Sequence, residues 1–174
     1  MTKPRLFHVS EEAGIARFDP RPPPSSDAGV EGDCVWAVDE AHLPNYLLPR
    51  DCPRITYGRG PGTSEEDVAR FLVGAKRVVA FEAAWLDRVQ AGVLRVYEMP
   101  EESFECALPE AGYWIARTSV TPRAERVQTD LIAALTSAGA EVRVLQDFWP
   151  LCDALAASSL EFSIIRKRNA LPRR

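Results

Sequence analysis

Short apolar runs alternate with polar and proline-rich segments along most of the chain. Residues 5–10 (RLFHVS), 33–39 (DCVWAVD) and 77–81 (RVVAF) are rich in β-branched and aromatic side chains, and residues 93–98 (VLRVYE) alternate apolar with polar positions. Both patterns are typical of β-strands. Weaker runs of the same kind predict further strands at residues 55–57, 104–108, 113–117, 141–145 and 162–165.

Helical spacing occurs between these runs. Ser64-Glu65-Glu66-Asp67 forms a capping box, in which the Ser64 hydroxyl can accept from the Asp67 N–H, and it predicts a helix that continues to about Ala75. Further helices are predicted at residues 40–48, 83–90, 128–137 and 149–157. Pro44 marks either the first turn of residues 40–48 or a break in that helix.

The order of these elements predicts the fold class. Strands dominate the first two thirds of the chain, and the last third alternates helix, strand and helix. The length of 174 residues suits one domain. We therefore expect a single α+β domain over residues 1–174, with an exposed proline-rich loop near residues 20–26 (PRPPPSS) and a short basic C-terminal tail.

Net charge, apolar runs and cysteine spacing limit the expected binding partners and the expected cellular compartment of the protein. The formal net charge of -4 argues against a nucleic-acid partner, since phosphate contacts need a basic surface. Neither a secretory signal nor an apolar run of the ~18 residues needed for a membrane span is found, so we expect a cytoplasmic protein. Its cysteines (Cys34, Cys52, Cys106 and Cys152) form no CxxC pair, which predicts free, at least partly buried thiols and no metal site.

His8 is the first candidate for chemistry. Strand alternation places Leu6, His8 and Ser10 on one face, where a histidine and a hydroxyl could hold a ribose or an amide edge. The alternative is a half-buried histidine that bonds a nearby carbonyl. Sequence alone leaves both interpretations open, and it favours the second.

Arginines in irregular segments are the second candidate. Arg21, Arg50, Arg54 and Arg59 lie in loops rich in proline or glycine, and guanidinium groups match phosphate well. The alternatives are ordinary surface arginines, or a loop clamp of Arg50 or Arg54 with Asp51. In the C-terminal region, Arg166 and Arg168 would share a face if the last strand continued to residue 168.

Standard catalytic motifs are absent from the sequence. There is no GxGxxG after a strand, no phosphate loop ending in Lys-Ser/Thr and no GxSxG elbow. A pair of a histidine with a serine or a cysteine stays open, although nothing marks one. Glu82, Glu98 and Glu105 lie near predicted strand ends and could act as acids or bases, but most such glutamates are solvated.

The ordered segments resemble a known superfamily. The order of seven segments is similar to that of the ADP-ribosyltransferase-like superfamily. These segments are an opening Leu-Phe-His-Val-Ser, the strand 35–37, a helix bearing Tyr46, LRVYE (94–98), SFE (103–105), GYWI (112–115) and VTP (120–122). That superfamily includes NAD-dependent transferases and RNA 2'-phosphotransferases. More closely, the phrases LLPRDCPR (47–54) and FSIIR (162–166) resemble a small bacterial family of unknown function over nearly the whole length.

The superfamily resemblance implies an ADP-ribosyltransferase-like split β-sheet core with flanking helices and a pocket for NAD. His8, with Ser10 beside it, would bind the nicotinamide-ribose side, and Tyr46 would stack on nicotinamide. The superfamily's late-strand glutamate has no counterpart, because an aromatic residue of GYWI (112–115) occupies its position. Glu110 or Glu98 could substitute for it.

Three functional hypotheses follow. The first is an enzyme acting on NAD or a nucleotide, in which His8 orients a ribose, Tyr46 stacks the base, and Arg50 or Arg54 holds phosphate. The second is a non-catalytic nucleotide-binding module, and the third is a protein-interaction module that uses the proline-rich loop and the basic tail. A nucleotide-type pocket ranks first, while the choice between enzyme and binder stays open.

Overall fold

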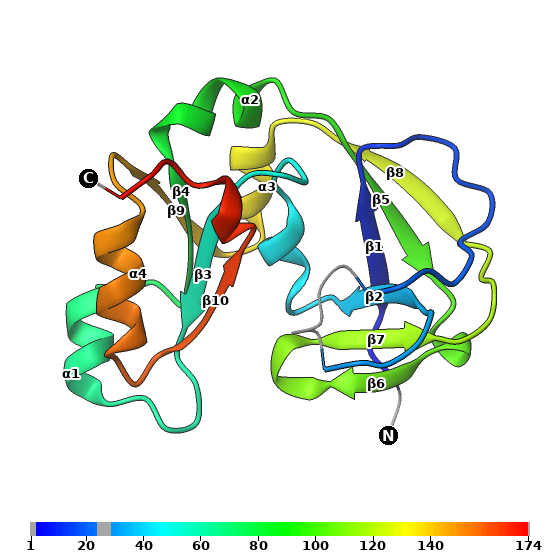
Figure 1. Ribbon diagram of the computed structural model, residues 1–174, viewed down its shortest axis with the longest axis horizontal. Helices are drawn as coiled ribbons and strands as arrows, with labels where there is room; N and C mark the ends of the chain where they lie inside the picture. The colour runs from blue at the N-terminus through cyan, green and yellow to red at the C-terminus, as the bar shows by residue number, and fades with distance from the viewer. Residues whose placement is uncertain (1–2, 24–28, 174) are drawn as a thin grey trace. The chain divides into compact units, whose positions relative to one another are not determined.

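The computed structural model describes residues 3–23 and 29–173. These residues form a mixed α+β structure with two β-sheets and four α-helices. Two compact units divide the chain: unit 1 comprises Met1–Tyr46 and Leu94–Gln128, and unit 2 comprises Leu47–Val93 and Thr129–Arg174. The α+β class predicted from the sequence is confirmed at this level, and one sheet belongs to each unit (Figure 1).

Unit 1 is built on a six-stranded antiparallel sheet with the order β6-β7-β2-β1-β5-β8. Its strands are β1 (Leu6–Ser10), β2 (Val35–Asp39), β5 (Leu94–Met99), β6 (Glu105–Leu108), β7 (Tyr113–Ala116) and β8 (Ala124–Gln128). A 3-10 helix, η2 (Leu43–Tyr46), follows β2, and two further 3-10 turns, η5 (Glu101–Ser103) and η6 (Pro109–Ala111), flank β6.

The two faces of this sheet carry different side chains. One face is apolar and packs on a buried cluster that includes Leu6, Phe18, Ala37 and Met99. Paired residues of antiparallel strands share a face and neighbours along a strand alternate. Trp36, next to Ala37 on β2, therefore lies on the other face. There it is joined by Val38 and by Tyr113, because Val38 pairs with Tyr113.

Unit 2 contains a four-stranded sheet with the order β10-β3-β4-β9. The strands are β3 (Arg54–Gly58), β4 (Arg77–Glu82), β9 (Ala140–Leu145) and β10 (Glu161–Ile165), and only the β4–β9 pair is parallel. The α-helices are α1 (Glu65–Asp67), α2 (Leu86–Gln90), α3 (Leu131–Ser137) and α4 (Trp149–Ala156). The π-helix η3 (Val68–Leu72) continues α1, and the 3-10 turn η4 (Ala83–Trp85) precedes α2. A last 3-10 turn, η7 (Lys167–Asn169), follows β10.

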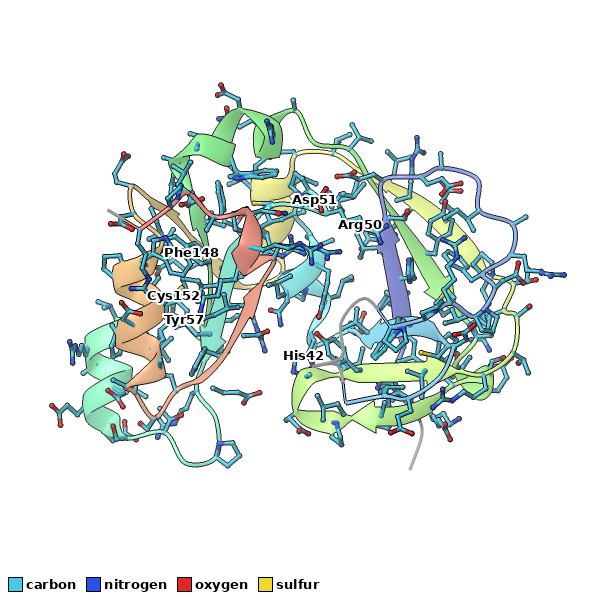
Figure 2. The ribbon with its side chains drawn as sticks, viewed as in Figure 1. His42, Arg50, Asp51, Tyr57, Phe148 and Cys152 are labelled. Carbon is cyan, nitrogen blue, oxygen red and sulfur yellow. The ribbon has the colours of Figure 1, made fainter. Side chains whose placement is uncertain are left out.

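The core of unit 2 forms between the sheet and α4. Tyr57 of β3 is buried together with Phe148 and Cys152 (Figure 2). The strand residues Ile55, Val78 and Ala80 complete one apolar face of the sheet, and Phe71 and Leu72 of η3 join the same cluster. In Figure 1, α1 and α4 lie on one side of this sheet and α3 on the other.

Most predicted strands are confirmed, and the departures have local causes. Residues 40–48 contain only the 3-10 helix η2 instead of a longer helix. The helix after Ser64 changes to π geometry at Val68 and ends before Val73, although Ser64 Oγ accepts from the Asp67 N–H as predicted. The helix predicted from residue 128 begins at Leu131, since residues 124–128 form β8, a strand that the sequence analysis did not predict.

The structure describes the predicted proline-rich loop and the predicted basic C-terminal tail only in part. Residues 24–26 of the proline-rich loop lie outside the described residues, while Arg21 forms an isolated bridge with Cys34. Near the C-terminus, β10 ends at Ile165 and Arg166 adopts a left-handed conformation with φ 56°, so the strand alternation considered for Arg166 and Arg168 does not occur. Arg174 also lies outside the described residues.

All four cysteines are free, and Cys34, Cys52 and Cys152 are buried whereas Cys106 is exposed. The prediction of free thiols is confirmed, but the expectation of burial is wrong for Cys106. Within residues 3–23 and 29–173, no helix is long and apolar enough to cross a membrane.

Candidate functional site

His8 packs against the apolar core of unit 1. Its ring centroid lies 4.7 Å from that of Phe18, and His8 pairs with the buried Tyr97 on β5. The Nδ1 atom lies 2.8 Å from the Trp36 carbonyl oxygen, so Nδ1 carries the proton and donates it. These contacts match the alternative of a half-buried histidine that bonds a carbonyl. A role in binding a ligand stays a prediction.

Ser10 and Tyr46 lie in different surroundings. The Ser10 hydroxyl accepts a hydrogen bond from the Glu12 N–H, which closes a local turn after β1. Tyr46, at the end of η2, donates its hydroxyl to the Tyr113 hydroxyl at 2.6 Å. Tyr113 lies on the face of the sheet opposite to that of His8, so the structure groups Tyr46 with Tyr113 and not with His8.

Arg54 shapes the loop that precedes β3 in unit 2. Its side chain is 3% exposed, and Nη1 donates to the carbonyl oxygens of Pro49 and Cys52, each at 3.0 Å. Arg54 therefore clamps backbone carbonyls, whereas the sequence analysis considered a clamp with Asp51. Its proposed role as a phosphate ligand stays a prediction.

The rest of that loop is held from the C-terminal segment. Arg166 Nε donates to the Arg50 carbonyl at 3.1 Å, and Asn169 Nδ2 donates to the Asp51 carbonyl at 2.7 Å. The backbone carbonyls of residues 49–52 thus all accept hydrogen bonds, which explains why an irregular segment can have a fixed conformation. Arg50 and Asp51 themselves are exposed. Figure 2 labels both residues.

An aromatic cluster occupies the second face of the unit 1 sheet. The rings of Trp36 and Tyr113 meet edge to face, with centroids 5.6 Å apart, and the ring of Tyr46 lies 6.3 Å from that of Tyr113. Trp36 Nε1 is buried and has no hydrogen-bond partner; among the described residues it is the one buried side-chain nitrogen or oxygen in this state. Since buried donors are nearly always paired, this N–H calls for an acceptor that residues 3–23 and 29–173 do not supply.

An aspartate–histidine pair lies at the end of β2, against Gly112, the residue that precedes Tyr113. By strand alternation the Asp39 side chain is on the face of Leu6 and Ala37, opposite to that of Trp36. His42 Nδ1 is 2.7 Å from Asp39 Oδ1, and the His42 backbone N–H donates to the same oxygen at 2.9 Å. Both side chains are 17% exposed. Burial acts to raise the pKa of Asp39, but the hydrogen bonds and charge of His42 and the backbone N–H of Ala41 outweigh it and hold the pKa below its ordinary value.

Gly112 allows this pair to form next to the β6–β7 turn. The Asp39 N–H donates to the Gly112 carbonyl at 3.0 Å, and Gly112 has a φ of +64°. A Cβ at Gly112 would overlap His42 Nδ1 and would lie 2.6 Å from His42 Cγ and 2.9 Å from Asp39 Oδ1. Only glycine fits here, for reasons of both space and conformation. Figure 2 shows His42 at this end of the β6–β7 hairpin.

The aromatic cluster of Trp36, Tyr46 and Tyr113 and the Asp39–His42 pair at the end of β2 are together called the unit 1 site below. The site offers aromatic surfaces, an indole N–H donor, a phenol hydroxyl and an imidazole nitrogen. Such a set can stack on a planar ring and bond both acceptors and hydroxyl donors. Among the residues in the structure's described ranges, no group of three or more His, Cys, Asp or Glu side chains could hold a metal ion.

The glutamates considered from the sequence have other surroundings. Glu98 is paired with Arg5 at 3.1 Å, and Glu105 and Glu110 are exposed. Glu82, in unit 2, is 2% exposed, and both of its carboxylate oxygens lie 3.1 Å from the Leu171 N–H. Arg59 pairs with Glu65.

Of the five residues of the unit 1 site, the sequence analysis had singled out Tyr46 alone. The Asp39-Glu40-Ala41-His42 spacing was a usable signal, because a carboxylate at the end of a strand often accepts from the backbone N–H groups of the following turn. Trp36 and Tyr113 gave no such signal, since their meeting depends on the pairing of β2 with β7, which is not readable from local pattern.

Comparison with known proteins places the chain in one family. The model of a family of unknown function, DUF6886, matches residues 7–170. The chain belongs to the DUF6886 family. No curated protein and no solved structure matches it.

The DUF6886 match spans both units of the fold, from β1 to the turn after β10. All five residues of the unit 1 site fall within the matched range, as do His8, Ser10, Arg50 and Arg54. The family assignment confirms the full-length resemblance to a family of unknown function. It carries no activity, so any function has to be argued from the site.

Proposed function

We propose that this protein binds a nucleotide-type small molecule through the unit 1 site. The observation that carries the proposal is the buried Trp36 N–H, which has no acceptor within the described part of the chain. A carbonyl, ring nitrogen or phosphate oxygen of a ligand would supply that acceptor. An unpaired buried donor costs on the order of 1–3 kcal/mol, and a protein that binds a ligand there recovers this cost on binding.

The chemistry around Trp36 supports a nucleotide as the ligand class. Tyr46 and Tyr113 provide aromatic surfaces on which a base can stack, and their hydroxyls are already joined at 2.6 Å. The imidazole of His42, which lies against Gly112 just before β7, suits a sugar hydroxyl. Planar aromatic walls with a few convergent polar groups are the usual composition of small-molecule sites.

We further propose that the fold is a diverged member of the ADP-ribosyltransferase-like superfamily, with NAD as the first ligand to test. The support comes from Tyr46, which the resemblance names, and from the strand GYWI (112–115), which it matches to the superfamily's late strand. Tyr46 matches the nicotinamide-stacking aromatic, and Tyr113 lies on β7, the late strand where the superfamily carries its glutamate. The hydrogen bond between Tyr46 and Tyr113 brings these two positions together.

The missing superfamily glutamate favours a second candidate function, a binding module without transferase activity. An aromatic residue in the place of the glutamate cannot supply the negative charge that would stabilise an oxocarbenium-like transition state. In this alternative the protein holds its ligand without turning it over. Incubation with NAD and quantification of released nicotinamide separates the two, since the enzyme releases nicotinamide and the binder does not.

A thermal-shift screen with a matched pair of variants tests the binding proposal. NAD, ADP-ribose, nucleotides and nucleotide phosphates are added to the wild type and to Trp36→Phe. A ligand at 100 times its Kd should add about 2.7 kcal/mol to the free energy of unfolding. Trp36→Phe keeps an aromatic ring but loses the N–H, so the ligand-induced shift should fall sharply while the stability of the free protein changes by about 1 kcal/mol or less.

Trp114→Phe is the control for this experiment. Trp114 is in the same sheet and packs against the opposite, apolar face, so its loss should leave the ligand-induced shift in place. Equal shifts in wild type and Trp36→Phe, or no shift with any member of the panel, would count against the proposal.

A further inference from the structure

The carboxylate of Glu82, at the end of β4 in unit 2, is buried without a cation. Glu82 is 2% exposed, and its two oxygens share one donor, the Leu171 backbone N–H, at 3.1 Å each. Within residues 3–23 and 29–173, no lysine, arginine or histidine pairs with Glu82 and no other hydrogen bond reaches its side chain. A carboxylate offers about four acceptor positions, and buried carboxylates are ordinarily paired. Glu82 therefore has acceptor capacity that the described residues leave unused.

The segment that supplies this N–H, residues 170–173, is held on unit 2 mostly by polar groups. Trp149 Nε1 donates to the Leu171 carbonyl at 2.7 Å. Arg173 donates two hydrogen bonds to the Asp153 carboxylate, at 2.7 and 2.8 Å, and its guanidinium carbon lies 4.5 Å from the centroid of the Trp149 ring. Ala170 packs against the apolar cluster of unit 2, whereas residues 171–173 are exposed. In Figure 1 this segment, drawn in red, runs from η7 past β4.

These contacts form a pattern that is suited to a peptide. Glu82 accepts from the N–H of Leu171, and Trp149 donates to the C=O of the same residue, so both backbone groups of one residue are recognised. Main-chain hydrogen bonds of this kind supply affinity in peptide recognition, and side-chain pockets supply specificity. Here the specificity element is the place of Arg173, where a carboxylate meets the planar guanidinium fork and an aromatic ring contacts it.

The segment can leave this place without unfolding unit 2. Exposed ion pairs contribute little to stability, and exposed residues such as 171–173 bury little apolar area. Segments of this kind open locally at a small cost in free energy, while the sheet and α4 stay folded. Once the segment has left, Glu82, Trp149 and Asp153 have lost the partners described above.

We propose that Glu82, Trp149 and Asp153 form a binding site for an arginine-bearing peptide segment of another chain, and that residues 170–173 occupy this site as an internal ligand. The incoming peptide places a backbone N–H on Glu82, the carbonyl of the same residue on Trp149, and an arginine two residues further on against Asp153. This inference goes beyond the proposed function and does not depend on it, because no residue of the unit 1 site takes part.

A full-length variant with a released segment makes the site accessible. It combines Leu171→Pro, which removes the N–H that Glu82 accepts, with Arg173→Glu, which places a negative charge beside Asp153. Both positions are exposed, so the fold should be kept. Arg173→Ala is a second, milder variant. Arg168→Ala removes an exposed arginine outside the segment and is the matched control, which should behave like the wild type.

The indole N–H signal of Trp149 in a ¹H–¹⁵N NMR spectrum reports whether the site is occupied, since hydrogen bonding shifts such a signal. Trp149→Phe identifies it among the four tryptophans. Each protein is titrated with the blocked peptide NALPR, the sequence of residues 169–173, and with NALPA, in which alanine replaces the arginine. The signals of Trp36, Trp85 and Trp114 report whether each variant is folded.

NALPR should return the Trp149 signal of the released variant to its wild-type position, and NALPA should not. The wild type should need at least about tenfold more NALPR, because its own segment competes at a high effective concentration. Asp153→Asn in the released variant should weaken the binding of NALPR. No response to NALPR in the released variant or in Arg173→Ala, or equal responses to both peptides, would overturn the inference. A Trp149 signal that stays at its wild-type position in the released variant would overturn it as well.

Discussion

Gly112 determines whether the Asp39–His42 pair can form. Its φ of +64° is unfavourable for other residues, and a Cβ there would overlap the imidazole of His42. We predict that Gly112→Ala lowers the free energy of unfolding by more than about 2 kcal/mol, because the positive φ alone costs about 1–2 kcal/mol and the overlap adds to it. Urea unfolding of the purified variant measures this change.

Gly14→Ala is the matched control for this prediction. Gly14 has a similar φ of +69°, but a Cβ there would meet nothing within 4 Å. It therefore carries the conformational cost without the overlap. If the two variants lose the same stability, the packing of Gly112 against His42 has no energetic weight.

The two histidines show how far residue-level prediction reaches. For His8, strand alternation gave the correct face, and the favoured alternative of a carbonyl partner agrees with the bond to Trp36. His42 was passed over because its significance depends on Asp39 and Gly112, and Gly112 comes from a distant turn. Local pattern identifies a face of a strand, but not the partner that tertiary structure brings to it.

At the scale of elements, the helix after Ser64 ends in an unusual way. Its last turn is a π-helix, and Val73 then adopts φ 49° and ψ 41°, while 73% exposed. A β-branched residue rarely takes the left-handed conformation. We predict that Val73→Gly stabilises the protein by about 1 kcal/mol, since the strain is relieved and little buried area is lost. Thermal unfolding followed by circular dichroism measures the difference.

Val93→Gly provides the comparison for Val73. Val93 is another exposed valine of unit 2, at 45%, and it does not have a positive φ. There a glycine only increases the conformational entropy of the unfolded chain, so Val93→Gly should destabilise the protein. A loss of stability in Val73→Gly as large as in Val93→Gly would show that Val73 is not strained.

Elements were predictable where burial imposed a pattern. Strands with buried positions, such as β2, β4 and β5, were found from their apolar runs. Strand β8 (AERVQ) was missed because it lies at the edge of its sheet, where four of its five residues are exposed and no apolar alternation is required. The change to π geometry at Val68 also leaves no trace in helical spacing.

At the scale of the whole molecule, the α+β class could be predicted but strand pairing could not. The parallel pairing of β4 with β9 joins segments about sixty residues apart in sequence, and β1 pairs with both β2 and β5. Such pairings depend on long-range packing, which a single sequence does not display. The prediction of one domain over residues 1–174 stays a prediction. The contacts within the chain define two compact units.

Acid pH should destabilise the folded protein through several carboxylates. Side-chain hydrogen bonds lower the pKa of Asp19 (from Ser119), Asp67 (from Ser159) and Asp153 (from Arg173), and the pKa of Asp39 is lowered although burial opposes it. A carboxyl group whose pKa is lower in the folded state stabilises the fold above its unfolded pKa. This stability is lost as the pH falls through the folded pKa. The decline therefore lies below about pH 4, because an aspartate in an unfolded chain has a pKa of about 3.9.

Alkaline pH acts through the buried thiols, with the opposite sign. Burial raises the pKa of Cys52 from 9.0 to about 12 and that of Cys152 to about 11. Above pH 9 the unfolded chain loses these protons while the folded protein retains them, so the unfolded state is favoured. We predict that stability falls above pH 9, by up to about 1.4 kcal/mol per pH unit for each such thiol.

Cys52→Ala tests this alkaline decline directly. Urea unfolding under reducing conditions at pH 7, 9 and 10 gives the dependence of stability on pH for each protein, and each is compared with its own value at pH 7. The variant should show a shallower decline because one buried thiol no longer ionises on unfolding. Cys106→Ala removes an exposed thiol and should leave the decline unchanged. If stability declines with pH equally in wild type and in Cys52→Ala, Cys52 ionises in the folded state as readily as in the unfolded chain. That result would contradict the raised pKa that burial gives this thiol.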